Sequence, residues 1–354
     1  MTTDAPIRTA IIGLGRAGWE IHVAGLRGRD DYRIVACVDP EPERRREAEL
    51  IAGCRAYASV DELLAAPHGA ELAIVCTSSD THVPLAIRLL DAGLHVLAEK
   101  PMATGPEQAA HMVAAARAAR TFYAVHQNLR FGAEFRQLRR LIASGAVGEP
   151  FLVKLAWTSF ARRNDWQTLR RFGGGTLNNS GAHALDLCVV LMDAPIVDVW
   201  ADLRAVATAG DAEDHAKLML RGANGRVIDV ELSSGMAAEQ RGWQVFGRLG
   251  SIVRDGDAFV VRSLDPRELP PLEVQPTLAV PGRRYGVVGG EELRWREERV
   301  PAAPPEMALD LYAELWRAIR RGAPFEITLD QLAEQMRINA LARAASRAAR
   351  PAAR

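Results

Sequence analysis

A glycine-rich turn near the N-terminus constrains the fold more than any other feature of the chain. Residues 13–18 read GLGRAG, follow a short apolar run and precede a helical pattern, the context in which a GxGxxG motif indicates a dinucleotide-binding turn. We expect Gly13 to form the tight turn, Gly15 to let the backbone approach a pyrophosphate, and Gly18 to let the helix pack closely on the strand. The free N–H groups at the start of that helix would then bind the phosphates.

An acidic residue follows at the distance that such a domain requires. Asp39 ends the second apolar run, where a carboxylate receives the ribose hydroxyls of the dinucleotide. Because this carboxylate would repel a 2′-phosphate, we predict NAD as the cofactor in preference to NADP. The alternative is that the glycines are simple turns and that Asp39 caps a helix.

The N-terminal part of the chain alternates strand-like and helix-like segments. Apolar, strand-like runs lie at 8–12, 32–39, 55–57, 71–77, 94–99 and 121–126, and helical patterns separate them at 40–53, 60–66, 83–92 and 107–120. This alternation predicts an α/β fold with a doubly wound parallel sheet and helices on both of its faces. We assign residues 1–127 to this nucleotide-binding domain.

The rest of the chain has a different pattern. Strand-like runs occupy 150–159, 196–206, 214–222, 226–234, 242–254 and 258–264, helices are expected at 135–144, 306–321 and 330–349, and residues 265–299 suggest a loop with short strands. Short turns such as GANGR between the runs indicate antiparallel pairing. We assign residues 128–354 to a second domain, for substrate binding and oligomerisation.

The segment LHVLAEKPM, residues 94–102, ends an apolar run on charged groups. In a doubly wound sheet, ligands bind beyond the carboxyl ends of the strands, and Glu99 and Lys100 lie at such an end. Lys100 would then lie close to the nicotinamide, with Pro101 fixing the local backbone. Partial desolvation can lower the pKa of a lysine, so Lys100 could act as an acid or as an electrostatic stabiliser. The alternative is a surface lysine at the start of a loop.

Three segments together resemble the Gfo/Idh/MocA oxidoreductase family: AIIGLGRAGWEIH, CTSSDTHVPLAIRLLDAGLHVLAEKPMA and GGGTLNNSGAHALDL. The resemblance implies an N-terminal Rossmann domain and a C-terminal α/β domain with a large open, mostly antiparallel sheet. It also implies NAD(P)-linked oxidation or reduction of sugars, inositols and related polyols. The pattern and the resemblance together predict these cofactor-binding residues: Gly13, Gly15, Arg16, Ala17, Asp39, Thr77, Ser79, His82, Glu99, Lys100 and Asn128. Ser78 and Ser79 stand where the family usually has proline and asparagine.

The segment GGGTLNNSGAHALDL carries the predicted substrate site. Asn179 and His183 are four residues apart, so they share one face if a helix begins here. The resemblance implies that both positions bind substrate, with His183 as general base, but the family's aspartate is here Asn179. Because an amide cannot take a proton, the proton transfer falls to His183 or to Lys100. The alternative for His183 is a helix-capping or core histidine, and Asp186 could orient it or face the core.

The loop before this segment is polar and carries an indole. Arg163, Asp165 and Trp166 suit a polyhydroxylated ring through hydrogen bonds and stacking, although a solvated loop with one anchoring tryptophan would have the same composition. The resemblance to an NxRF segment also implies that Asn128 and Arg130 face the cleft. His22 and His126 are expected to be structural, and no spacing of His, Asp, Glu or Cys indicates a metal site.

Composition limits the partners. Lysine plus arginine equal aspartate plus glutamate at 44 each, so no net charge favours nucleic acid or a membrane surface. We see no signal peptide and no apolar run of membrane-spanning length. Four cysteines without a CxxC pair are typical of a reducing cytoplasm. An open sheet usually finds a partner, so a homodimer or homotetramer is expected.

These observations lead to one main functional hypothesis and two alternatives. The main hypothesis is an NAD-dependent oxidoreductase that transfers a hydride between nicotinamide and a sugar, inositol or related polyol, with Lys100 and His183 as the catalytic residues that manage the proton. One alternative is a keto-sugar reductase in which Lys100 is the acid. The other is a regulator of the same fold that binds nucleotide and sugar without turnover.

Overall fold

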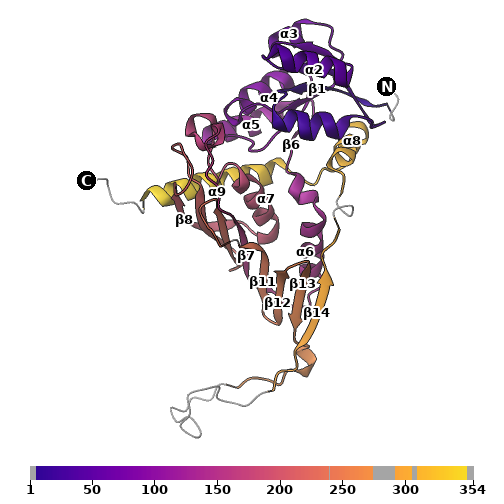
Figure 1. The fold of residues 1–354 in the computed structure, drawn as a ribbon. Helices are drawn as coiled ribbons and strands as arrows, with labels where there is room; N and C mark the ends of the chain where they lie inside the picture. The colour runs from indigo at the N-terminus through magenta and orange to yellow at the C-terminus, as the bar shows by residue number, and fades with distance from the viewer. Residues whose placement is uncertain (1–4, 239, 274–291, 305–308, 349–354) are drawn as a thin grey trace, which may run out of the picture.

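The computed structural model describes residues 5–238, 240–273, 292–304 and 309–348, which form two sheets with their covering helices (Figure 1). The first sheet is parallel throughout, in the order β3-β2-β1-β4-β5-β6. Its strands are β1 (Ile7–Ile12), β2 (Tyr32–Val38), β3 (Arg55–Tyr57), β4 (Leu72–Val75), β5 (His95–Ala98) and β6 (Tyr123–Val125). The predicted doubly wound parallel sheet is therefore confirmed.

The helices between these strands cover the sheet. They are η1 (Ala17–Val23), which continues into α1 (Ala24–Leu26), α2 (Pro42–Ala52), α3 (Val60–Ala65), η2 (Ser79–Thr81), α4 (His82–Asp91) and α5 (Pro106–Ala118). All four residues of β4 are buried, as expected for a strand covered on both faces. The strand order reverses between β1 and β4, which opens a crevice at the carboxyl ends of these two strands.

The second sheet has eight strands in the order β14-β13-β12-β11-β7-β10-β9-β8. They are β7 (Pro150–Thr158), β8 (Ile196–Arg204), β9 (His215–Gly222), β10 (Val227–Ser233), β11 (Arg241–Gly247), β12 (Gly250–Asp255), β13 (Ala258–Ser263) and β14 (Arg296–Pro301). Only β7 and β10 pair in parallel, so the sheet is mostly antiparallel, as expected.

The run at 242–254 was wrongly read as one strand. It is a hairpin, in which β11 and β12 pair antiparallel and Gly247 lies opposite Gly250. The turn consists of Arg248 and Leu249, so Arg248 is its one polar residue and the apolar pattern does not reveal it. Gly247 and Gly250 flank the turn and allow the tight connection. In Gly250, φ is +159°, and a Cβ there would approach the Arg262 carbonyl oxygen of β13 to 2.0 Å.

The helices of the second half connect the two sheets. They are η3 (Asn128–Phe131), α6 (Ala133–Ala143), η4 (Trp166–Thr168), η5 (Arg170–Phe172), α7 (Ser180–Met192), η6 (Pro266–Glu268), α8 (Leu311–Arg321) and α9 (Leu329–Ala348). Leu311 and Leu315 of α8 belong to the core of the first sheet, whereas Ile338 and Ala342 of α9 belong to the core of the second. Figure 1 shows α9 running between the two parts of the molecule. We propose that the division into 1–127 and 128–354 follows the two sheets, with α8 returning to the first core.

The four cysteines are buried and free, and Cys37 and Cys76 pack in the core of the first sheet. The helices in the described part of the chain are too short or too polar to cross a lipid bilayer.

Candidate active site

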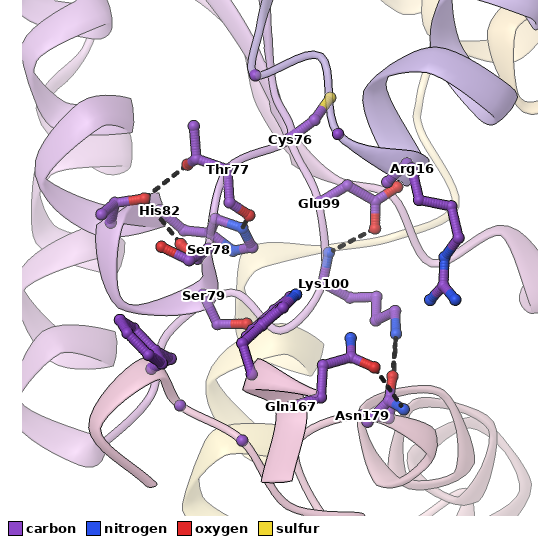
Figure 2. A pocket seen from close by; sticks show the side chains of 18 of the residues that line it. Arg16, Cys76, Thr77, Ser78, Ser79, His82, Glu99, Lys100, Gln167 and Asn179 are labelled. Carbon is purple, nitrogen blue, oxygen red and sulfur yellow. Dashed lines mark hydrogen bonds between the residues drawn. The ribbon is translucent and has the colours of Figure 1, made fainter. Parts of the chain in front are cut away.

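A cavity of about 710 Å³ lies at the crevice of the first sheet and is closed by loops of the second half (Figure 2). Fourteen of the predicted site residues line it: Gly13, Gly15, Arg16, Ala17, Asp39, Thr77, Ser79, His82, Glu99, Lys100, Arg163, Asp165, Trp166 and Asn179. Its size is ordinary for a small-molecule or cofactor site. The sequence therefore predicted most of the residues that line the cavity. It did not single out Gln167, Phe172 and Asn178, which also line it.

The glycine turn has the geometry that a bound pyrophosphate needs. Gly13 has φ +95°, and a Cβ at Gly18 would stand 1.9 Å from the Gly13 carbonyl oxygen, so the helix can lie this close to β1 only with glycine there. A Cβ at Gly15 would meet nothing within 4 Å and would instead fill the cavity that Gly15 lines. These residues therefore leave a backbone cradle at the start of η1 that fits a dinucleotide.

Asp39 presents a carboxylate at the end of β2. Its Oδ2 accepts the Leu14 N–H at 2.8 Å and its Oδ1 accepts the Glu41 N–H at 2.9 Å, and the residue is 2% exposed. The Arg44 guanidinium approaches Oδ2 at 3.5 Å and lines the same cavity. Because each carboxylate oxygen can accept a second hydrogen bond, Asp39 retains the capacity to bind two ribose hydroxyls.

Lys100 crosses from the first sheet toward the second half of the molecule. Its Nζ donates to the Asn179 Oδ1 at 2.9 Å, and this contact joins the end of β5 to the residue that precedes α7 (Figure 2). Burial lowers the pKa of Lys100, Glu99 opposes this effect, and the positive charges of Arg16 and Arg163 add to the lowering. The ammonium group can therefore give up a proton more readily than an exposed lysine does.

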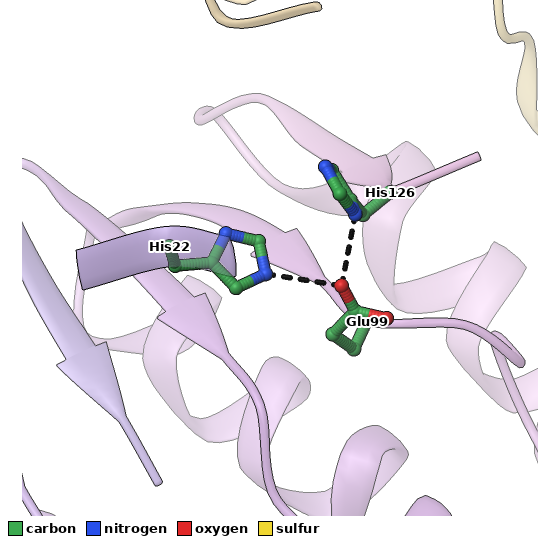
Figure 3. Close-up of side chains that lie close together, drawn as sticks. All are labelled: His22, Glu99 and His126. Carbon is green, nitrogen blue, oxygen red and sulfur yellow. Dashed lines mark hydrogen bonds and ion pairs between the residues drawn. The ribbon is translucent and has the colours of Figure 1, made fainter. Parts of the chain in front are cut away.

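Beneath Lys100 lies a buried group that the sequence did not reveal as a unit. Glu99 Oε1 is 3.0 Å from His22 Nε2 and 2.8 Å from His126 Nδ1 (Figure 3). The Tyr312 hydroxyl is 2.9 Å from His22 Nδ1. Burial raises the pKa of Glu99, but hydrogen bonds from His126 and His22 outweigh it and hold the pKa well below its usual value. The carboxylate is therefore ionised and fixed, and its Oε2 accepts the Lys100 backbone N–H at 3.2 Å.

The structural role expected for His22 and His126 fits this arrangement. Their ligating atoms and that of Glu99 all lie within 4.8 Å of one another, a grouping that could also hold a metal ion. Both histidines are hydrogen-bonded to the same carboxylate oxygen, so the group is satisfied as it stands. No spacing could have revealed it, because the three residues come from η1 and from the ends of β5 and β6.

His183 lies one turn into α7, on the same face as Asn179. Its Nδ1 is 3.1 Å from the Gln127 Oε1, while the Gln127 amide nitrogen donates to the Ala182 carbonyl at 3.2 Å and to Gln335 at 3.1 Å. Because the amide N–H groups are used in this way, the Gln127 oxygen accepts the Nδ1–H of His183. The Nε2 atom then carries no proton and has no hydrogen-bond partner among the described residues.

The electrostatics of His183 couple it to Lys100. Burial, followed by the positive charge of Lys100, lowers the pKa of His183 to about 3. Its imidazole is therefore neutral at neutral pH. It can accept a proton only when a negative charge offsets the positive charge of Lys100. His183 is not among the residues that line the main cavity, whereas Asn179 and Lys100 are.

The predicted substrate residues form a hydrogen-bonded edge of the cavity. Arg163 donates to the Asp165 Oδ2 at 2.7 Å and to the Gln167 side chain, and Gln167 accepts in turn from Asn179 at 3.5 Å. Trp166, which is 42% exposed, follows in η4. This edge offers hydrogen-bonding groups beside an indole, which is a surface suited to a sugar or polyol.

Three predicted residues have other surroundings. His82 lines the cavity, but its ring nitrogens face the Pro101 oxygen at 2.8 Å and the Thr77 oxygen at 3.1 Å, so it ties β4 to the segment after Lys100. Asn128 is exposed in η3 and does not line the cavity, so the geometry gives its predicted cofactor contact no support. Arg130 was expected at the cleft, and this is wrong.

Arg130 is fully buried. Its guanidinium binds the Asp186 carboxylate through Nε at 3.0 Å and Nη2 at 2.5 Å and donates to the Glu326 carbonyl at 3.0 Å. Asp186 is thus a core residue and does not orient His183. The pair joins η3 to α7, the helix that begins next to the predicted substrate residue Asn179.

Family models match both halves of the chain. The model described as "Oxidoreductase family, NAD-binding Rossmann fold" matches residues 7–127, and the "GFO/IDH/MocA C-terminal domain" model matches residues 135–253. The chain belongs to the Gfo/Idh/MocA oxidoreductase family. It is therefore an NAD-binding oxidoreductase, and the family resemblance of its sequence is confirmed.

Characterised relatives and solved structures agree with this family. The myo-inositol 2-dehydrogenase of Thermotoga maritima is 30% identical over 70% of this chain and 75% of its own length. The D-glucoside 3-dehydrogenase of Escherichia coli is 31% identical over 55% of this chain and 56% of its own length. The WlbA dehydrogenase of Bordetella pertussis, solved with NADH and UDP-GlcNAcA, has a TM-score of 0.76 at 22% identity and covers 97% of both chains.

Proposed function

We propose that this member of the family is an NAD-dependent dehydrogenase of a sugar, inositol or related polyol. The observation that carries the proposal is the 2.9 Å contact between Lys100 Nζ and Asn179 Oδ1, with His183 one helical turn further. It brings an ammonium group, an amide and an imidazole together beside the cavity that the glycine turn and Asp39 share. A hydroxyl group of a bound polyol would replace or extend this contact.

We further propose how the residues divide the reaction. NAD held by the glycine turn and Asp39 would supply the hydride acceptor for the carbinol carbon. His183 takes the hydroxyl proton on Nε2, with Gln127 holding the ring in the required tautomer. Lys100 stabilises the developing alkoxide, and Asn179 positions both Lys100 and the substrate hydroxyl.

The low pKa of His183 is consistent with this division. In the resting site, burial and then the repulsion between an imidazolium and the Lys100 ammonium lower the pKa of His183 to about 3. During the reaction a negative alkoxide lies between the two groups, so the repulsion that Lys100 exerts is offset at the moment when His183 takes the proton. The two residues therefore act as a pair, and the proton leaves as the ketone forms.

Asp39 supports NAD as the preferred cofactor. Its carboxylate is fixed by two backbone N–H groups and would repel a 2′-phosphate. The alternative is a reductase that works on the keto compound with Lys100, in place of His183, as the acid. Which direction is used depends on the supply of substrate.

We also propose that the protein is a cytoplasmic homo-oligomer. Trp200 of β8 is 51% exposed, on the side of the strand opposite the buried Ala201 and Leu203. Such a surface can be covered by a second copy. Light scattering at micromolar concentration should give a mass of at least two chains, and a mass of about 38.6 kDa would reject this proposal.

Turnover tests the main proposal. The protein would be incubated with NAD and a panel of free sugars, inositols and glycosides while the absorbance of reduced nicotinamide is followed. We expect many equivalents of NADH per protein with at least one member of the panel. Binding of NADH without turnover of any member would favour the regulator alternative.

A further inference from the structure

Two further cavities continue from the main one into the second half of the molecule. A narrow one shares Arg163, Gln167 and Asn179 with the main cavity. It also shares Thr176, Ser180 and Ser234 with a cavity of about 700 Å³ between the start of α7 and the strands β7, β10 and β12. Gln167 and Asn179, whose side chains are hydrogen-bonded to each other, thus lie between the main cavity and the narrow one.

The contact between Gln167 and Asn179 is weak. The hydrogen bond from Asn179 to Gln167 is 3.5 Å long, at the limit for such a bond, and both groups are amides that can bind a ligand oxygen instead. A substrate that reaches Lys100 in the main cavity therefore lies next to an opening that leads into the second large cavity.

The wall of this second cavity is rich in hydroxyl groups and has one indole. Ser159, Thr176, Ser180 and Ser234 line it, and none of their side-chain hydroxyls has a hydrogen-bond partner in the described part of the chain. Trp157, which is partly buried against the core of the second sheet, forms another part of the wall. Uncommitted hydroxyls beside an indole suit the hydroxyl-bearing edge and the apolar face of a sugar ring.

The charges in these walls are already balanced. Arg254 donates to Glu134 at 3.2 Å, and Glu213 accepts from Arg343 at 3.0 and 3.1 Å. Asp214 accepts three backbone N–H groups, each at 2.7 Å. Arg163, the basic residue among those that line the narrow cavity, is itself paired with Asp165, so this lining offers a phosphate group no unpaired cation.

We infer that the second cavity binds the neutral sugar ring of a glycoside whose neighbouring ring is oxidised at Lys100. This inference rests on the proposed function and names its substrate class. The oxidised ring occupies the main cavity, the glycosidic link passes Gln167 and Asn179, and the second ring stacks on Trp157. The substrate is then a neutral disaccharide or larger glycoside, in preference to a free monosaccharide or a nucleotide-linked sugar.

The test compares matched substrates with NAD. Glucose, galactose, mannose and N-acetylglucosamine would each be supplied as the free sugar, as the methyl glycoside, as the terminal ring of a disaccharide and as the UDP-linked form. We expect kcat/KM for one disaccharide to exceed that for its parent sugar at least about tenfold. Equal values for parent and disaccharide, or the highest value for a UDP-linked form, would overturn the inference.

Two variants locate the effect in the second cavity. Ser159→Phe fills it, and we expect it to remove the preference for the disaccharide while leaving the parent sugar within about twofold. Trp157→Leu should lower kcat/KM for the disaccharide roughly 2- to 12-fold. Trp295→Leu is the matched control, because this indole is 42% exposed and lines none of the three cavities. If Ser159→Phe affected parent and disaccharide equally, the second cavity would not be a subsite.

A binding measurement separates this inference from the proposed function. If no sugar is turned over, calorimetric titration of the protein with NAD and each disaccharide still reports on the second cavity. Binding that Ser159→Phe weakens at least about tenfold supports the subsite even though the proposed oxidation has failed. Absence of disaccharide binding, or binding that the variant does not change, contradicts it.

Discussion

Replacing Asp39 by asparagine should weaken the binding of NADH and improve that of NADPH. The substitution keeps the shape of the side chain but removes its charge. An amide oxygen can still accept the Leu14 N–H that Asp39 Oδ2 now accepts at 2.8 Å, but the amide NH2 group then faces the Glu41 N–H that Oδ1 accepts at 2.9 Å. What is lost is an ionised acceptor for two ribose hydroxyls in a site where Asp39 is 2% exposed.

The magnitude follows from the kind of hydrogen bond involved. A hydrogen bond to a charged group contributes about 1.5–3 kcal/mol, so the dissociation constant for NADH should rise roughly 10- to 150-fold. For NADPH the like-charge repulsion disappears, and Arg44, at 3.5 Å from the carboxylate, becomes free to pair with the 2′-phosphate. The ratio of the two dissociation constants should therefore move toward NADPH by more than the loss for NADH alone.

The assay needs no substrate. Binding of NADH and of NADPH would be followed by nicotinamide fluorescence for the wild-type protein and for Asp39→Asn. Asp61→Asn is the control, because Asp61 is an exposed carboxylate in α3 outside the main cavity. Unchanged affinities for both nucleotides in Asp39→Asn would show that the carboxylate does not face the ribose, and would refute the reasoning.

Three further outcomes follow from the same structure. Lys100→Met should raise the pKa of His183 from about 3 toward its ordinary 6.5, because part of the lowering comes from the Lys100 charge; NMR titration of the imidazole checks this, and an unmoved pKa would mean that the two groups do not interact. The folded-state pKa of His183 is below its unfolded value, so the stabilisation that its neutral form gives is complete above about pH 6.5 and decreases as the pH falls. Between pH 7.5 and pH 5, the free energy of unfolding of His183→Asn in urea denaturation should therefore decrease by about 2 kcal/mol less than that of the wild type. Equal decreases would contradict this prediction. Arg130→Met leaves Asp186 buried and unpaired and should destabilise the protein by about 3–5 kcal/mol, whereas Arg299→Met, which removes a half-exposed side chain, should change stability by no more than about 0.5 kcal/mol in the same assay.

Local motifs made the nucleotide half of the site predictable. Gly13, Gly15 and Gly18 act through backbone geometry over a few residues, and Asp39 and Lys100 follow strands whose apolar runs are visible in the sequence. The carboxyl ends of parallel strands meet at one edge, so these residues had to come together once the alternation of strands and helices was recognised.

Contacts between distant segments were not predictable in this way. The binding of Glu99 by His22 and His126 joins residues that are 77 and 27 positions away, and each histidine alone looks like an ordinary core residue. Arg130 was misplaced because a sequence does not reveal that an arginine is buried, and only the fold supplies its partner Asp186. Gln127 was missed for the same reason, since its role comes entirely from its neighbour His183 in α7.

The most direct test of the central claim is the turnover number of Lys100→Met and of His183→Asn on the best substrate at saturating NAD, with NADH binding measured in parallel. If the two side chains manage the proton, kcat should fall about 10²- to 10⁴-fold in each variant while NADH still binds. Wild-type kcat in either variant would contradict the assignment of that residue to catalysis.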